Sequence, residues 1–253
     1  MTLHNRARFV PAAIRSVLTQ TVSTFHLIVV DDGSSDEAPD LAQRLAAEDA
    51  ARLGHSRVTL MRSPRIGRFA ALAVAHDAAA RLAPSALLGW VDSDDLLVDT
   101  ALAETTAFLQ NHPSCGMVYT QHIIIDDANR PLGLGPRCLV PYSPQALLLD
   151  FLTHHFRLFR PSLYRDIGGV DSSFTSAGDY DFCLKASERT TILHLPRPLY
   201  CYRVHPDSIS LARHDEQRAN AVRAIEAALV RRGLADRLRL VVTPDRRFQL
   251  VDR

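Results

Sequence analysis

Two apolar runs in this chain end abruptly in aspartates, at residues 27–32 and 86–95. A short apolar run bounded by polar residues is typical of a buried strand. The carboxylates at the two ends are Asp31, Asp32, Asp92, Asp94 and Asp95. In open α/β sheets, ligands bind beyond the carboxyl ends of the strands. The two runs therefore predict a sheet with carboxylates gathered at one edge, where a ligand can bind.

Crowded carboxylates repel one another and are stabilised by a positive charge between them. A divalent cation such as Mg²⁺ or Mn²⁺ is the usual solution, because both ions prefer oxygen ligands. A solvated turn before the next helix is the alternative for a single Asp-Ser-Asp segment. The presence of a second aspartate cluster, at 31–32, favours the ligand site.

The hydrophobic pattern alternates between the strand and the helix period along the first half of the chain,. This order predicts an α/β fold with a mostly parallel, doubly wound sheet flanked by helices. The pattern predicts helices at 6–20, 34–52, 67–82 and 98–111, and strands at 25–30, 57–61, 87–91 and 117–125. Further along, it predicts a turn at 126–129, a loop at 130–145, helices near 145–153, at 179–188 and at 215–232, strands near 156–160 and at 191–204, and two short strands at 238–251.

The chain enters its first helix after only a few residues. A sheet of this kind normally begins with a strand, and residues 1–4 are too short to supply a full one. We therefore expect the first strand to be lacking, as in a truncated gene start or a fragment of a longer chain.

The composition excludes several classes of protein. A formal net charge of +1 argues against nucleic-acid binding through a broad basic field,. No apolar run approaches the ~18–20 residues of a membrane span, and the spread of arginines over residues 1–20 is unlike a secretory leader,. The four cysteines lack Cys-x-x-Cys spacing, which favours thiols in a reducing compartment,. We expect a cytoplasmic location, including the inner face of the membrane.

Five short motifs in order give the chain a family resemblance. They are residues 16–21 (SVLTQT), 29–36 (VVDDGSSD), 91–95 (VDSDD), 178–182 (GDYDF) and 202–210 (YRVHPDSIS). The chain resembles glycosyltransferases of family 2, which have the GT-A nucleotide-sugar-binding fold, over about residues 3–211. The resemblance implies a GT-A domain at 1–211, with a nucleotide-sugar half at about 1–126 and an acceptor half at about 127–211. A C-terminal helix and short-strand extension would occupy 212–253.

The resemblance implies nucleotide contacts for two residues. Asp32 would accept a hydrogen bond from the imide N–H of uracil, which is a donor that suits a carboxylate. Either Asp31 or Asp32 would instead help to start the following helix. Arg68 stands at the start of a predicted helix, where the helix dipole adds positive potential and its side chain can reach a nucleotide. A solvated surface arginine is the alternative for Arg68.

The Asp-x-Asp segment implies the donor and metal contacts. Asp92 would face the ribose or the metal region, and Asp94 would ligate a divalent cation, Mn²⁺ or Mg²⁺, that bridges both phosphates. Asp95 would be a supporting residue or a helix cap. His205 would complete the metal shell or touch the diphosphate, because a neutral imidazole can ligate Mn²⁺; a structural histidine is the alternative. No role is assigned to the remaining histidines considered, His112, His122, His154 and His155.

Asp179 matches the aspartate of the Glu-Asp motif of the family, which implies that it is the general base for the acceptor hydroxyl. The chain departs from the motif at the preceding position, which is Gly178. Asp179 would also serve as a cap for the helix that follows. Asp181 lies about 200° further around that helix and is expected to point away from the site.

These observations predict an inverting, metal-dependent glycosyltransferase that uses a nucleotide-diphosphate sugar, with UDP-sugars favoured. The expected acceptor is a hydroxyl of a glycan, a lipid-linked oligosaccharide or a small molecule, with peripheral membrane association and no nucleic-acid partner. A catalytically inactive or binding-only domain is the first alternative, because of the short N-terminus and Gly178. A nucleotidyltransferase is the second, although no glycine-rich basic loop follows the first strand.

Overall fold

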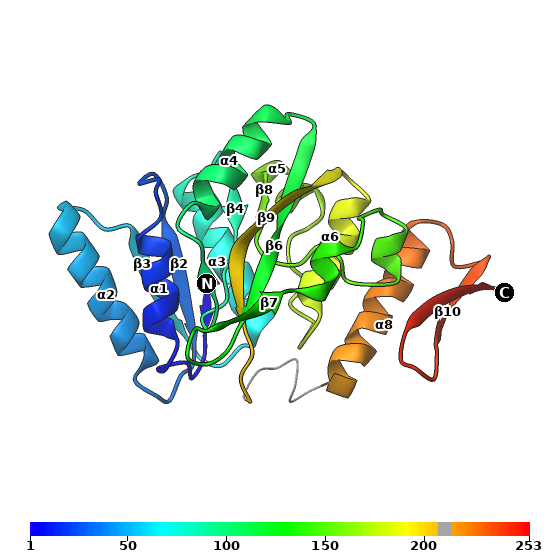
Figure 1. Ribbon diagram of the computed structural model, residues 1–253, viewed down its shortest axis with the longest axis horizontal. Helices are drawn as coiled ribbons and strands as arrows, with labels where there is room; N and C mark the ends of the chain where they lie inside the picture. The colour runs from blue at the N-terminus through cyan, green and yellow to red at the C-terminus, as the bar shows by residue number, and fades with distance from the viewer. Residues whose placement is uncertain (207–213) are drawn as a thin grey trace.

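The computed structural model describes residues 1–206 and 214–253, and these residues form two larger sheets with helices around them and a two-stranded C-terminal hairpin (Figure 1). The first sheet has three parallel strands in the order β1-β2-β3, and the second is larger and mixed. The strands of the first sheet are β1 (Thr2–Leu3), β2 (Leu27–Asp32) and β3 (Val58–Ser63). The helices are α1 (Val10–Leu18), α2 (Ala38–Leu53), α3 (Arg68–Leu82), α4 (Ala101–Asn111), α5 (Pro161–Asp166), α6 (Gly178–Ser187) and α8 (His214–Arg231).

Strand β2 is buried on both faces, as expected for a parallel strand between helical layers,. Successive side chains of a strand point to opposite faces. Leu27 and Val29 pack with apolar side chains of α1 and α2, whereas Ile28 and Val30 pack with α3. Helices therefore cover both faces of β2 up to its C-terminal end, and this fixes the position of the aspartates there.

The second sheet has the strand order β4-β8-β6-β9-β5, and β7 pairs with β6 at its edge. The pair β6–β9 is parallel, whereas the other pairs in this sheet are antiparallel. Its strands are β4 (Leu88–Gly89), β5 (Leu96–Leu97), β6 (Cys115–Ile125), β7 (Pro131–Leu134), β8 (Arg157–Phe159) and β9 (Thr191–Arg203). Two 3₁₀ turns, η1 (Pro136–Leu139) and η2 (Ala146–Leu148), lie between β7 and β8.

The predicted order of elements is confirmed, but three local predictions change. Residues 130–145 were expected to be a loop, yet β7 forms there as an edge strand that begins with Pro131, a position where a missing N–H costs no ladder bond,. The helix expected near 145–153 is a single 3₁₀ turn. The strands expected at 191–204 form one continuous strand, because β6 offers a parallel partner along most of that length.

A short first strand is present where the sequence led us to expect none. Thr2 and Leu3 pair in parallel with Val30 and Asp31, and the N-terminal ammonium of Met1 donates a hydrogen bond to the Ile28 carbonyl oxygen (2.8 Å). Strand β2 pairs with β3 along one edge, and among the described residues its other edge is open apart from β1. Two extended residues are therefore enough to pair with backbone groups on that open edge. The expectation of a lacking first strand is therefore corrected.

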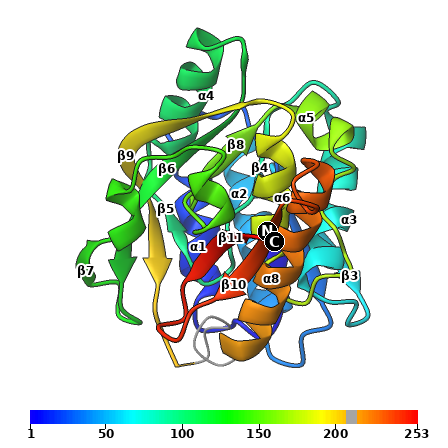
Figure 2. The same ribbon diagram turned by 90° about the vertical axis from the view of Figure 1, so that its right-hand side faces the viewer.

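The C-terminal residues pack against the second half of the fold (Figure 2). Helix α8 lies along α6, with small side chains such as Ala224 and Ala228 fully buried between them. The antiparallel hairpin of β10 (Leu238–Val242) and β11 (Phe248–Asp252) confirms the two predicted short strands. The proposed domain boundary at 211/212 falls within 207–213, outside the described residues. None of the helices in the described ranges is long and apolar enough to cross a membrane.

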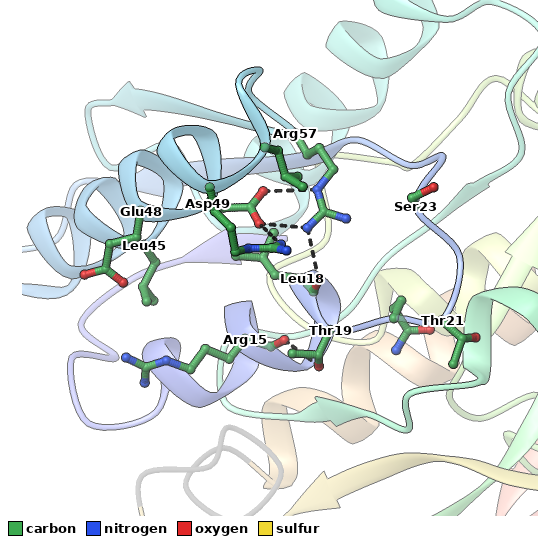
Figure 3. Close-up of a pocket in the computed structure, with 12 residues that line it drawn as sticks. Arg15, Leu18, Thr19, Thr21, Ser23, Leu45, Glu48, Asp49 and Arg57 are labelled. Atoms are coloured by element: carbon green, nitrogen blue, oxygen red, sulfur yellow. Dashed lines mark hydrogen bonds and ion pairs between the residues drawn. The ribbon is translucent and has the colours of Figure 1, made fainter.

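A cavity of about 640 Å³ lies between the C-terminal ends of α1 and α2, at the opposite end of β2 from the aspartates (Figure 3). At this end of the sheet, Arg57 donates from Nε and Nη2 to both carboxylate oxygens of Asp49 (3.0 and 2.8 Å) and from Nη2 to the Leu18 carbonyl oxygen (3.0 Å). The Arg57 and Asp49 side chains are 6% and 3% exposed. This buried pair ties α1, α2 and β3 together.

We predict that Asp49→Ala will lower the free energy of unfolding by roughly 3–5 kcal/mol, because it leaves the Arg57 charge buried without a partner. Hydrogen bonding to Arg57 lowers the pKa of Asp49 in the folded state. The pair therefore stabilises the protein above the unfolded pKa of about 3.9, and this contribution is lost as the pH falls through the lower folded value.

Urea unfolding at several pH values measures both effects. The control is Asp40→Ala, which removes an exposed pair with Arg62 and should cost at most about 1 kcal/mol,. Equal losses for the two variants would show that the buried pair contributes no more than a surface pair.

Candidate active site

The two aspartates at the end of β2 have different partners. Asp31 accepts a hydrogen bond from the Ser34 backbone N–H (3.1 Å), so it supports the turn that leads towards α2. Asp32 accepts from the backbone N–H groups of Ile66 (2.6 Å) and Gly67 (3.0 Å), which directly precede α3. Of the two alternatives, Asp31 is thus the residue that supports the turn before α2, and Asp36 accepts from the N–H of Ala38 at the start of that helix. Asp32 is buried beside the start of α3, and its contact with a base stays a prediction.

Arg68 and Asp92, both predicted to bind the nucleotide sugar, form an ion pair. Arg68 is the first residue of α3, and its Nη2 lies 2.8 Å from each carboxylate oxygen of Asp92, just beyond β4. Burial raises the pKa of Asp92, and the Arg68 charge opposes that rise. Arg68 is therefore directed into the site, not towards solvent as the alternative had it.

Two side chains from distant parts of the chain, Arg6 and His205, hold Asp94. Its Oδ2 accepts from Arg6 Nε (3.0 Å) and from His205 Nε2 (3.2 Å). Burial alone would raise the pKa of Asp94, but the hydrogen bond from His205 and the charge of Arg6 outweigh it and lower this pKa to about 2. The structure thus brings together the two residues predicted to ligate a metal, Asp94 and His205. The rest of the motif that contains His205, Asp207 to Ser210, lies outside the described residues.

Asp95 is a supporting residue and not part of the exposed surface. Its two oxygens accept from the Tyr200 hydroxyl (2.7 Å) and from the Arg203 backbone N–H (2.7 Å). Burial and the neighbouring charges of Asp94 and Asp92 raise its pKa well above the usual range. Arg203 in turn donates from Nε to the Asp94 carbonyl oxygen (2.6 Å), so β9 fixes the backbone of the aspartate segment.

A second set of potential metal ligands lies beside these residues. One ligand atom from each of Asp92, Asp95 and His155 lies within 4.8 Å of the others. His155 is 6% exposed, its Nδ1 has no hydrogen-bond partner, and burial lowers its pKa well below the usual range, which keeps the imidazole neutral. Carboxylate oxygens with a neutral imidazole fit Mn²⁺ better than Mg²⁺, which prefers an all-oxygen shell. His155, to which the sequence assigned no role, is therefore part of the site.

Asp179 lies in the first turn of α6, facing the aspartate cluster. Its Oδ1 accepts from the Tyr180 backbone N–H (3.0 Å), and its Oδ2 lies 3.5 Å from Arg157 Nη2. Asp179 is close enough to Asp92 for its charge to raise the pKa of that residue. Asp181 instead pairs with Lys185 on the same helix (2.7 Å).

The glycine that departs from the family motif has a physical reason. A Cβ at Gly178 would lie 2.9 Å from three ring carbons of Phe69, and the Phe69 side chain is almost fully buried. Phe69 follows Arg68 in α3. The ring therefore occupies the space of any side chain at position 178.

The sequence missed five residues that complete the site: Arg6, His155, Arg157, Tyr200 and Arg203. Arg6 and Arg203 carried a usable signal, because Arg6 begins the first predicted helix and Arg203 belongs to the 202–210 motif. The remaining three carried none, because their roles depend on which strands become neighbours.

Comparison with known proteins supports the fold and the family. The family model described as glycosyl transferase family 2 matches residues 1–168. A chondroitin synthase of Escherichia coli is 27% identical over 231 residues, which are 91% of this chain and 32% of that protein. The chain thus spans about a third of the length of this relative.

Two solved structures are similar in fold. One is S. aureus TarS 1–349 in complex with UDP, with a TM-score of 0.66 and 18% identity over 90% of this chain and 64% of that chain. The other is the mannosyltransferase PcManGT from Pyrobaculum calidifontis in complex with GDP-Man and Mn²⁺, with a TM-score of 0.64 and 19% identity over 91% of this chain and 62% of that chain. The predicted GT-A fold is confirmed.

We predict that Gly178→Ala will destabilise the protein by roughly 1–2 kcal/mol, because the overlap with Phe69 exceeds the gain in helix propensity,. Thermal melts measure the change. Combining it with Phe69→Leu, which makes room for the new methyl group, should cost less than the two single changes together. A Gly178→Ala protein that melts at or above the wild-type temperature would contradict the steric explanation.

Proposed function

Because the chain belongs to glycosyl transferase family 2, we propose that it transfers a sugar from a nucleotide-diphosphate donor to an acceptor hydroxyl. The observation that carries the proposal is the convergence of Arg68, Asp92, Asp94, Asp179 and His205 from separate elements onto one edge of the sheets. UDP-sugars are the proposed donors. The similarity to a UDP complex supports this choice, as does the placement of Asp32 beside the start of α3.

We propose that Arg68 and Asp92 position the donor and that Asp32 accepts from the base. Asp94 and His205 would hold a divalent cation, Mn²⁺ or Mg²⁺, with Asp92, Asp95 and His155 as an adjacent ligand set. A bound cation would neutralise the charge that develops on the leaving diphosphate. The Mn²⁺ in the complex of a protein with the same fold supports a metal at such a site.

In the proposed mechanism, Asp179 takes the proton from the acceptor hydroxyl as its oxygen attacks the anomeric carbon of the sugar. The bond to the diphosphate breaks at the same time, so one displacement inverts the anomeric configuration. Arg6 and Arg68 offer positive charge near the developing phosphate charge. The proximity of Asp179 to Asp92, shown by its effect on the pKa of Asp92, supports a base near the proposed donor site.

The acceptor is proposed to be a glycan, a lipid-linked oligosaccharide or a small molecule. A cytoplasmic location with peripheral membrane association is part of this proposal, as is the division into donor, acceptor and C-terminal parts. A screen of UDP- and GDP-sugars with Mn²⁺, read by nucleotide release, tests the function. If a nucleotide sugar binds but no nucleotide is released from any donor of the screen, the binding-only alternative is favoured.

We predict that Asp94→Asn will abolish the part of UDP affinity that depends on metal, because the amide is a poor ligand and frees Arg6 and His205,. Calorimetric titration of UDP with Mn²⁺ and with a chelator measures it. Asp127→Asn is the control, since Asp127 pairs with Arg8 on the surface. If the Asp94 variant keeps the wild-type dependence on Mn²⁺, the carboxylate is not a ligand.

We predict that Asp179→Asn will retain UDP affinity and lower sugar transfer by ~10²–10⁴-fold, which is typical for loss of a general base. The amide still accepts from the Tyr180 N–H but takes no proton. The rate is measured as nucleotide release from the best donor of the screen, with water as the acceptor or with an acceptor that a separate screen identifies. The control is Asp171→Asn, a turn aspartate that accepts from the Ser173 N–H. Wild-type turnover would remove Asp179 from the mechanism, whereas lost UDP affinity would assign it to the donor side.

A further inference from the structure

Arg157 carries a charge in an almost fully buried position. Its side chain is 1% exposed. Its Nε donates to the Thr153 carbonyl oxygen (2.6 Å), but neither terminal nitrogen has a hydrogen-bond partner. A buried cation is costly unless something compensates its charge. The position of the guanidinium therefore calls for an explanation beyond packing.

Two aromatic rings and the carbonyl oxygen of Thr153 fix the guanidinium in place. Its central carbon lies 5.2 Å from the ring centroid of Trp90 and 5.1 Å from that of Phe151. Such contacts stabilise a cation that has lost its water. Trp90 is itself buried and directly precedes the aspartate segment. The side chain is thus held rigidly, with its terminal nitrogens directed at α6.

Asp179 is the carboxylate towards which this charge is directed. Arg157 Nη2 lies 3.5 Å from Asp179 Oδ2, and this is the single ion pair that Arg157 makes within the described ranges 1–206 and 214–253. Position 178, where a neighbouring carboxylate could have competed for the guanidinium, is glycine, and its side-chain space is filled by Phe69.

The two oxygens of Asp179 are consequently anchored in different ways. Oδ1 accepts from the Tyr180 backbone N–H, and Oδ2 faces the guanidinium. Each oxygen of a carboxylate has two lone pairs, so one remains on each for a substrate hydroxyl. Two anchors define the plane of the carboxylate, whereas one would leave it free to rotate.

We propose that Arg157 is a positioning residue that holds the Asp179 carboxylate in the orientation in which it takes the acceptor proton. The proposal rests on the proposed role of Asp179 as the base. Arg157 touches no substrate in this scheme and acts through Asp179 alone. Losing it should leave donor binding intact and slow the chemical step by roughly 10–100-fold, the order expected when a reacting group is misplaced by about 1 Å.

A double-mutant cycle tests the proposal with Arg157→Met, Asp179→Asn and the combination. Methionine keeps the aromatic packing but removes the charge. Nucleotide release from the best UDP-sugar of the screen gives turnover and KM, and UDP titration gives donor affinity. We expect Arg157→Met to lower turnover with KM and UDP affinity unchanged. In the Asp179→Asn background the same change should lower turnover less than about twofold, because no base is left to position.

Thermal melts of the four proteins give a readout that needs no substrate. If the pair exists, the double variant should melt higher than the sum of the two single shifts predicts. Arg160→Met is the control, since Arg160 directly follows β8 and, within the described part of the chain, donates only to backbone carbonyl oxygens. It should lower the melting temperature without a coupling to Asp179→Asn, and Arg157→Lys, which keeps a positive charge, should restore part of the turnover.

Two results would overturn the proposal while the base role stands. One is a loss of turnover from Arg157→Met that is equally large with and without Asp179, which would mean that Arg157 binds a substrate group or only supports the fold. The other is wild-type turnover in Arg157→Met. If Asp179→Asn alone keeps full turnover, the proposed base fails instead, and the melting cycle still decides whether the pair exists.

Discussion

Repulsion among the aspartates at the strand ends is the constraint on which the rest of this site depends. Asp92, Asp94 and Asp95 lie within four positions of one another, and Asp179 approaches from α6. Buried carboxylates of this kind are stable only with compensating charge or hydrogen bonds. Within the protein, each aspartate has its own partner: Arg68 for Asp92, Arg6 for Asp94, Tyr200 for Asp95 and Arg157 for Asp179.

The partners come from elements that are far apart in the chain. Arg6 follows β1, Arg68 begins α3, and Arg203 ends β9. Each contact holds one of these elements against residues 92–95. The charge pairs that stabilise the aspartates therefore also fix how the two larger sheets lie relative to each other. In the proposed function, Arg6 and Arg68 would also offset the charge of a bound diphosphate, so the residues that stabilise the aspartates are the ones proposed to act on the donor.

The contacts around α6 show how a departure from a family pattern can leave the chemistry in place. Phe69 fills the space beside Gly178, and Arg157 faces Asp179 from the interior. A side chain at position 178 is therefore excluded by packing, and the proposed base is anchored by other means. This is a steric and electrostatic explanation for a motif that the sequence alone made look incomplete.

Local sequence determined the elements and the identities of the main acidic residues. The alternation of apolar runs and helical patterns predicted the α/β order, because burial on both faces of β2 requires a continuous apolar strand,. It failed where the partner strand decided the outcome. β7 forms because β6 offers an edge, and β1 forms from two residues because β2 does.

The sequence by itself determined that aspartates stand at two strand ends and that Asp179 begins a helix, since these are properties of neighbouring residues. Only the tertiary structure decided what neutralises them. Arg6 reaches Asp94 across 88 positions of the chain, and Arg157 reaches Asp179 from a strand that the sequence predicted without indicating this partner. Charge pairing depends on the distance between two groups in space. Residues far apart in the sequence come within that distance only when the chain has folded.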